Sequence, residues 1–154
     1  MKKLLAFVIA AVMTLFAMSA FASVESEVGD LSIFINGRLP DMGAAKVVNG
    51  RTMVPMDVFF EELGIFGSFE AETNTIVGLY PVLNSGPMII TMQVSNSLAF
   101  INQDTVELDA APIMDGGTVL VPLRFIAEKI GCVVVWDEET SAVSVATPAV
   151  DVAD

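Results

Sequence analysis

Carboxylates are the side chains of this chain best suited to chemistry, because its 154 residues include 19 Asp and Glu but no His. They cluster at residues 61–62, 70–72 and 137–139. Glycoside hydrolysis needs two carboxyl groups roughly 5 to 10 Å apart across a cleft. These clusters instead fall on an expected helix face and at expected hairpin turns, where charged groups are usually solvated. A hydrolase that uses paired carboxylates within these clusters, which mutation of Glu70 and Asp137 would test, is therefore the least favoured alternative.

The sequence lacks the other common signatures of catalysis and metal binding. Without His there is no Ser-His or Cys-His pair and no His ligand for copper or zinc. No P-loop, dinucleotide-binding or S-x-x-K pattern occurs, and we expect the single cysteine, Cys132, to be a small buried residue. No EF-hand loop occurs either, which leaves calcium binding at the acidic turns undecided. We expect no catalytic residue, no cofactor and no metal site, copper included.

The segment 1–22 has the pattern of a secretory signal peptide. Two lysines precede an apolar run at residues 4–16, and Ala-Phe-Ala follows at residues 20–22. This order predicts cleavage after Ala22 and a secreted or extracytoplasmic protein at a bacterial cell surface. The alternative is an uncleaved membrane anchor, because the apolar segment is nearly long enough to span a bilayer. We expect residues 23–30 to form a flexible leader.

The charge balance narrows the class of partner. Cleavage would remove two of the 7 basic residues and leave the segment 23–154 with 5 basic and 19 acidic side chains, a net charge of −14. Such a surface repels nucleic acid and anionic membranes. The membrane would then be contacted only through an uncleaved signal segment. We expect one domain with its own core, and a cell-wall polymer or another envelope protein as its partner.

Turn residues and apolar periodicity divide the rest of the chain into strands and two short helices. Pro55 suits the first turn of a helix, and Gly64 suits its end. The chain from residue 78 to residue 87 is loop-like. Strands, several joined by turns, are predicted at residues 31–35, 45–54, 69–77, 88–94, 98–102 and 133–145.

The segment that contains the first predicted helix has a similar counterpart later in the sequence. VPMDVFFEELG at residues 54–64 returns as VPLRFIAEKIG at residues 121–131, and the two halves align without a gap from 50–77 to 117–144. This repetition predicts an α+β fold in one domain. Its duplicated β-β-α-β-β unit, with half-repeats at about 31–80 and 88–146, would pack antiparallel strands around two short helices, followed by a flexible tail at 147–154.

A duplicated core unit makes specific burial predictions. If both helices pack into a shared core, their large apolar side chains are almost fully buried. For Trp136, which aligns with Phe69, we expect core packing in preference to stacking on a sugar. The helix residues expected to be buried are Phe59, Leu63, Phe125 and Ile130.

The second half carries a family resemblance. LDAAP at residues 108–112, VPLRFIAEKIG, and VWDEET at residues 135–140 together resemble the copper amine oxidase-like N-terminal domain, also called the stalk domain. The resemblance covers about residues 31–146. The matching positions, which we expect to define the fold, are Pro55, Gly64, Pro122, Arg124, Phe125, Glu128, Gly131, Trp136 and Asp137.

The resemblance implies a non-catalytic α+β domain of secreted and surface proteins. The catalytic domain of the oxidase would need three histidines and a Thr-x-x-Asn-Tyr segment that this chain lacks, so copper is not implied. The first half departs from the motif, with Asp57 at the position of Arg124, and we expect that arginine to hold a neighbouring acidic group or carbonyl. The expected function is a non-catalytic secreted or cell-envelope structural or binding module. The alternative is recognition of a cell-wall glycan or peptide along a sheet edge or a cleft between the halves.

Overall fold

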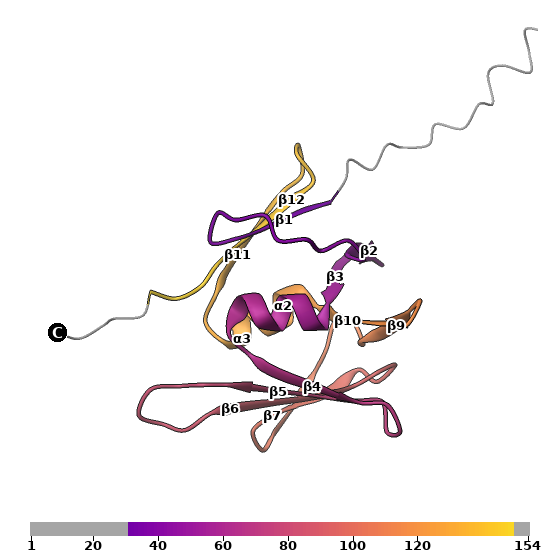
Figure 1. Ribbon diagram of the computed structural model, residues 1–154, viewed down its shortest axis with the longest axis vertical. Coiled ribbons are helices and arrows are strands. Elements are labelled where there is room, and N and C mark those ends of the chain that lie inside the picture. The colour runs from indigo at the N-terminus through magenta and orange to yellow at the C-terminus, as the bar shows by residue number, and fades with distance from the viewer. Residues whose placement is uncertain (1–30, 150–154) are drawn as a thin grey trace, which may run out of the picture. The chain divides into compact units, whose positions relative to one another are not determined.

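The computed structural model describes residues 31–149, which form one small domain of mixed α+β structure (Figure 1). Twelve strands in three sheets and two helices make up this part of the chain, and most strand pairs are antiparallel. These observations confirm the expected α+β class. The expected signal peptide at 1–22, the leader at 23–30 and the last residues of the expected tail lie outside the described residues.

A four-stranded antiparallel sheet, in the order β2-β3-β10-β9, leads into both helices. Asn49 and Gly50, with φ of 49° and 76°, form the turn between β2 and β3, as Asn-Gly turns of tight hairpins do. The strand-turn-strand passage expected at 45–54 is therefore present, whereas β9 was not expected. The bounds are β2 Lys46–Val48, β3 Arg51–Pro55, β9 Ile113–Asp115 and β10 Thr118–Pro122.

The two helices, α2 (Met56–Leu63) and α3 (Leu123–Lys129), each follow directly on a strand. Pro55 and Pro122 are the last residues of their strands, with φ values of −56° and −69° and extended ψ values of 124° and 114°. Pro55 was expected in the first turn of the helix, and that prediction was wrong. The proline ring fixes φ at about −65°, which suits the end of a strand as well as the start of a helix, so one residue serves both. Gly64 closes α2 in the left-handed conformation, with φ of 72°, as expected.

A five-stranded antiparallel sheet, in the order β4-β5-β6-β7-β8, lies on one side of the helices (Figure 1). Its strand β5 continues to Tyr80, so the loop expected to begin at residue 78 begins later. The last strand, β8, was not expected. The bounds are β4 Phe66–Glu70, β5 Thr75–Tyr80, β6 Met88–Gln93, β7 Leu98–Ile101 and β8 Asp104–Glu107.

A three-stranded sheet, in the order β1-β12-β11, lies on the other side of the helices (Figure 1). Strand β1 pairs in parallel with β12, which corrects the expectation of antiparallel pairing throughout. Asn36 follows β1 in a turn with φ of 51°, and the chain returns only through a single bridge between Ile35 and Arg38. The bounds are β1 Ser32–Ile35, β11 Val133–Asp137 and β12 Ala142–Ala146.

The burial predictions for the helices are confirmed for three residues of four. Phe59, Leu63 and Ile130 are buried, with exposed fractions of 0 to 5%. Phe125 is only half-buried, so that prediction was wrong. The buried stripe of α3 passes through Leu123, Ile126 and Ala127, and Phe125 lies beside it.

The core prediction for Trp136 was also wrong, because 38% of this residue is exposed. Its strand, β11, is an edge strand of the three-stranded sheet, so one flank of the strand has no neighbour to cover it. Cys132, just before this strand, is buried as expected, and burial raises the pKa of its thiol.

The element boundaries repeat at a constant interval. Five consecutive elements, β2, β3, α2, β4 and β5, have counterparts in β9, β10, α3, β11 and β12, and the starting residues of all five pairs are equally far apart in the sequence. Helix α2 follows β3 and packs against β10, whereas α3 follows β10 and packs against β3. The two halves differ beyond this set, because β5 is extended by β6 to β8 and β12 pairs with β1.

Candidate functional site

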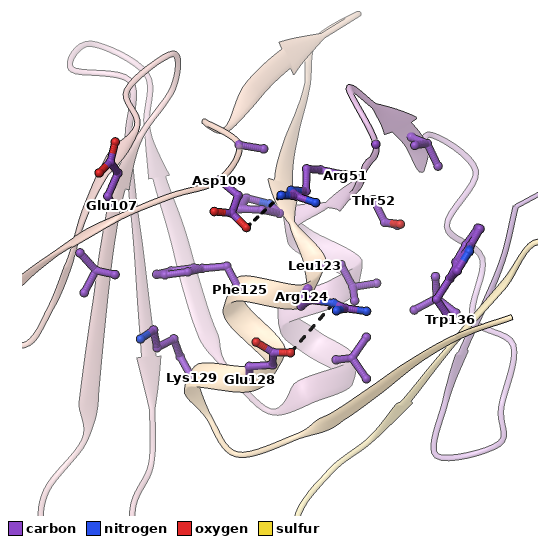
Figure 2. A pocket seen from close by; sticks show the side chains of 17 residues that line it. Arg51, Thr52, Glu107, Asp109, Leu123, Arg124, Phe125, Glu128, Lys129 and Trp136 are labelled. Carbon is purple, nitrogen blue, oxygen red and sulfur yellow. Dashed lines mark ion pairs between the residues drawn. The ribbon is translucent and has the colours of Figure 1, made fainter. Parts of the chain in front are cut away.

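A groove of about 680 Å³ lies beside α3 (Figure 2). The end of β2 and the start of β3 form one wall, the end of β8 and the segment after it form another, and α3 and β11 complete it. Its volume falls within the range of about 300 to 1,000 Å³ that is usual for ligand sites. The groove therefore offers room for a small molecule or for a short length of a polymer.

Basic side chains gather in this groove. Arg51 of β3 and Arg124 and Lys129 of α3 all line it, and they are three of the five Lys and Arg residues between 31 and 149. Both arginine side chains are more than half exposed. A domain with a large excess of acidic residues thus places most of its positive charge around one hollow.

The groove cations are held loosely by the protein. Arg51 Nη2 lies 3.3 Å from Asp109 Oδ2, and Arg124 Nε lies 4.0 Å from Glu128 Oε1. Both distances exceed the length of a good N–H···O hydrogen bond, which is about 2.7 to 3.2 Å, and the second exceeds it by far more. Arg124 was expected to hold an acidic group or carbonyl; its ion pair with Glu128 is present but long.

The basic residues outside the groove are paired more closely. Arg38 Nη2 donates to Glu62 Oε2 at 2.9 Å, and Lys46 Nζ donates to Asp115 Oδ2 at 2.6 Å. In contrast, none of the ion pairs within residues 31–149 includes Lys129, whose Nζ lies 5.5 Å from the centre of the Phe125 ring. The groove cations therefore keep more of their capacity for an external anion.

Two aromatic rings lie on opposite sides of the groove arginines. In Figure 2, Trp136 lies on one side of Arg51 and Arg124 and Phe125 lies on the other, with Glu107 farther out beyond Phe125. Trp136 is the only tryptophan of the chain. The two aromatic side chains that failed the core prediction are thus both in the wall of the groove.

The motif positions separate into two groups in the structure. Five of them line the groove: Pro122, Arg124, Phe125, Glu128 and Trp136. The other four, Pro55, Gly64, Gly131 and Asp137, lie at strand ends, helix ends or a turn.

Sequence reasoning did not identify Arg51, Asp109 or Lys129 as groove residues. Their charge was visible, and Asp109 stands in the LDAAP segment that carried the resemblance. The convergence of Arg51 with Lys129 depends on the pairing of β3 with β10, which brings β3 of the first half against α3 of the second.

The corresponding place beside α2 is different. A smaller hollow there is lined by residues 56–57, 60–61 and 64–67, and no Lys or Arg is among them. In the aligned halves, Asp57 takes the place of Arg124, and Glu62 takes the place of Lys129. The sign of the charge is therefore reversed at two positions, and the surface of α2 lacks the cations that α3 presents.

Two of the carboxylates considered for hydrolysis, Glu70 and Asp137, lie at two hairpin turns. Glu70 Oε1 accepts a hydrogen bond from the Glu72 N–H at 3.3 Å, and Asp137 Oδ1 accepts one from the Glu139 N–H at 2.9 Å. Hydrogen bonds from the Thr140 side chain, first, and from backbone N–H groups lower the pKa of Asp137. A general acid needs a raised pKa, and neither Glu70 nor Asp137 lines the groove. These two carboxylates are turn-forming groups.

The described part of the chain contains no cluster of metal ligands and no membrane-spanning helix. Between residues 31 and 149, no three His, Cys, Asp or Glu side chains are grouped so that they could hold a metal ion. In the same range, neither helix has the length and apolar character needed to cross a membrane.

Comparison with known proteins assigns the chain to a family. The family model of the copper amine oxidase N-terminal domain matches residues 34–145, which is more than half of the chain and nearly all of the described domain. No curated protein and no solved structure matches the chain. That family is a non-catalytic domain, in agreement with a structural module. The chain therefore belongs to the copper amine oxidase N-terminal domain family.

Proposed function

We propose that this protein is a non-catalytic module of the cell envelope or the secreted fraction, and that it binds its partner through the groove beside α3. The observation that carries the proposal is the convergence of five motif positions, with three basic residues, on that groove. The segment 1–22, with the pattern of a signal peptide, supports a location outside the cytoplasm. The domain would act without copper or any other cofactor.

The domain is, in our proposal, built from a duplicated β-β-α-β-β unit. Support comes from the constant interval between five consecutive elements and their counterparts. The pairing of β3 with β10 supports it as well, because Leu120 faces Pro55 and Pro122 faces Met53, symmetrically about Val54 and Val121. After duplication, one half would keep the scaffold role while the other acquired the cationic groove.

A peptide strand added to β11 is the second candidate function. Strand β11 is an edge strand, and Val133 and Val135 are 63% and 56% exposed. An extended peptide pairs with such an edge through main-chain hydrogen bonds and places alternate side chains on the exposed face. Substituting Val135→Lys would then abolish binding, whereas Arg124→Asp would have little effect.

The test of the proposed function uses the full chain. Cells expressing it are separated into cytoplasmic, membrane, wall and medium fractions, and purified protein is sedimented with isolated cell walls. We expect protein in the wall or medium fraction, and sedimentation that Arg124→Asp weakens and Arg38→Asp does not. Protein confined to the cytoplasm, or sedimentation unaffected by Arg124→Asp, would overturn the proposal.

A further inference from the structure

We propose that the groove binds an acidic glycan, with a sugar ring stacked on Trp136 and a carboxylate of the glycan paired with Arg51 and Arg124. The inference rests on the proposed function, because it names the ligand class of the same groove. Three independent features of the groove support it: its charge relative to the rest of the domain, the loose pairing of its cations, and the placement of its aromatic rings.

The distribution of acidic and basic residues restricts the places where an anion can bind this domain. Residues 31–149 contain 14 Asp and Glu against 5 Lys and Arg. The groove contains three of the basic residues and three acidic ones, Glu107, Asp109 and Glu128. The rest of the domain is left with 11 acidic and 2 basic residues, and both of those bases are in short ion pairs. An anionic ligand is repelled elsewhere and meets balanced charge only at the groove.

The loosely paired arginines suit a carboxylate. A guanidinium group donates two parallel N–H···O bonds to a planar anion, and the terminal nitrogens of Arg124 take part in none of the ion pairs within residues 31–149. Asp109, the partner of Arg51, has a side chain that is 78% exposed, so this pair is weak and readily exchanged. A ligand carboxylate would replace Asp109 at little cost.

The aromatic rings favour a sugar over an acidic peptide. The apolar face of a sugar ring packs on an aromatic face, and Trp136 offers an exposed ring on one side of the groove arginines (Figure 2). An extended peptide would instead pair through main-chain hydrogen bonds along the edge of β11. The groove presents an aromatic ring together with two arginines, which suits an acidic saccharide.

The experiment uses the fluorescence of Trp136, which reports on the groove alone because it is the only tryptophan. Purified full-length protein is titrated with oligogalacturonate and with oligoglucuronate. Parallel titrations use methyl-esterified oligogalacturonate, polyglutamate and polyglycerol phosphate. We expect saturable binding of at least one uronate oligomer, weakened by added salt, and no comparable binding of the other three probes.

Two variants test the named contacts, with calorimetry as readout and thermal unfolding to confirm folding. Arg124→Asp copies the first-half residue Asp57, and Trp136→Phe copies Phe69. Each should weaken uronate binding by about tenfold or more, since each removes a central contact. The matched control, Arg38→Asp, makes the same charge change outside the groove and should leave affinity within about twofold.

The outcomes separate this inference from the proposed function. The proposal of an acidic glycan is overturned if the esterified oligomer, polyglutamate or polyglycerol phosphate binds as tightly as the free uronate does. The proposal is also overturned if neither uronate oligomer binds. If the protein still sediments with cell walls in that case, the proposed function is retained without the acidic glycan as its ligand. Failure of both assays rejects both. Unchanged uronate affinity in Arg124→Asp or Trp136→Phe would place the glycan elsewhere.

Discussion

Val54 of β3 lies directly opposite Val121 of β10, and these two residues are also each other's counterparts in the repeat. Both are fully buried. Cross-strand neighbours of this kind are in side-chain contact. The pairing of β3 with β10 therefore joins equivalent positions of the aligned sequences, and each helix packs against the strand that precedes the other helix.

This symmetric contact predicts equal and coupled stability losses. Val54→Ala and Val121→Ala should each lower the free energy of unfolding by about 2 kcal/mol, because each removes two buried methyl groups from the same contact. The double variant should depart from the sum of the two by about 0.5 kcal/mol or more. Urea denaturation of the four proteins measures this. Strictly additive effects would argue against a shared contact.

The close packing of Phe60 against Gly67 and Gly78 predicts that substitutions at these three positions affect stability together. A Cβ on Gly67 would overlap Cδ2 of Phe60, and one on Gly78 would lie 2.9 Å from Ile65 Cγ2 and 3.1 Å from Phe60 Cε2. In the second half the counterparts of the two glycines are the paired residues Val134 and Val145, and the counterpart of Phe60 is the small Ala127.

Phe60→Ala should therefore cost about 3 to 5 kcal/mol of unfolding free energy by leaving a cavity. Adding Gly67→Val and Gly78→Val to that variant should recover part of the loss, although the same two substitutions in the wild-type protein should destabilise it by overpacking. Chemical denaturation distinguishes these cases. If the two valines destabilise the wild-type protein and the Phe60→Ala variant equally, the large side chain of Phe60 is not the reason for glycine at positions 67 and 78.

The helices should respond unequally to loss of an aromatic ring. Phe59→Ala should cost about 3 to 5 kcal/mol because Phe59 is fully buried. Phe125→Ala should cost clearly less, because Phe125 is half-buried beside the groove. Thermal and urea unfolding check the order, and a larger loss for Phe125→Ala would contradict its position in the groove wall.

Asp137 should contribute a pH-dependent share of stability. Its pKa is lowered in the folded protein by hydrogen bonds from Thr140 first and then from Glu139, so the stabilisation is fully present above the unfolded pKa and is lost as pH falls through the folded pKa. Asp137→Asn should therefore lower Tm at neutral pH and lose this effect in acid. A Tm difference that stayed constant between neutral and strongly acidic solution would refute the assignment.

Copper should leave the protein unchanged. A bound metal stabilises the folded state by mass action, and residues 31–149 contain no group of side chains suited to hold one. We expect the same Tm with and without micromolar copper. A rise of several degrees, reversed by a chelator, would show a site and overturn the expectation.

Local patterns predicted the elements wherever one side chain or backbone angle decides the conformation. Asn49-Gly50 and Gly64 lie in the turn and the helix end that their chemistry favours, whereas Pro55 ends the strand just before the helix that it was expected to begin. The parallel pairing of β1 with β12 was not predictable in this way, because these are the first and last strands of the domain and their pairing depends on how the sheets close around the helices.

The amino-acid sequence determined the α+β class, the position of both helices and the family, because all three depend on periodicity and on motifs that are contiguous in the chain. Only the tertiary structure determined which motif side chains are buried and which line the groove. Arg51, Arg124 and Trp136 come from three different elements, and β3–β10 pairing and the exposed edge of β11 turn them into one groove. Trp136 and Phe125 are residue types that are typical of a protein core. They are partly exposed because the fold places no further element over them.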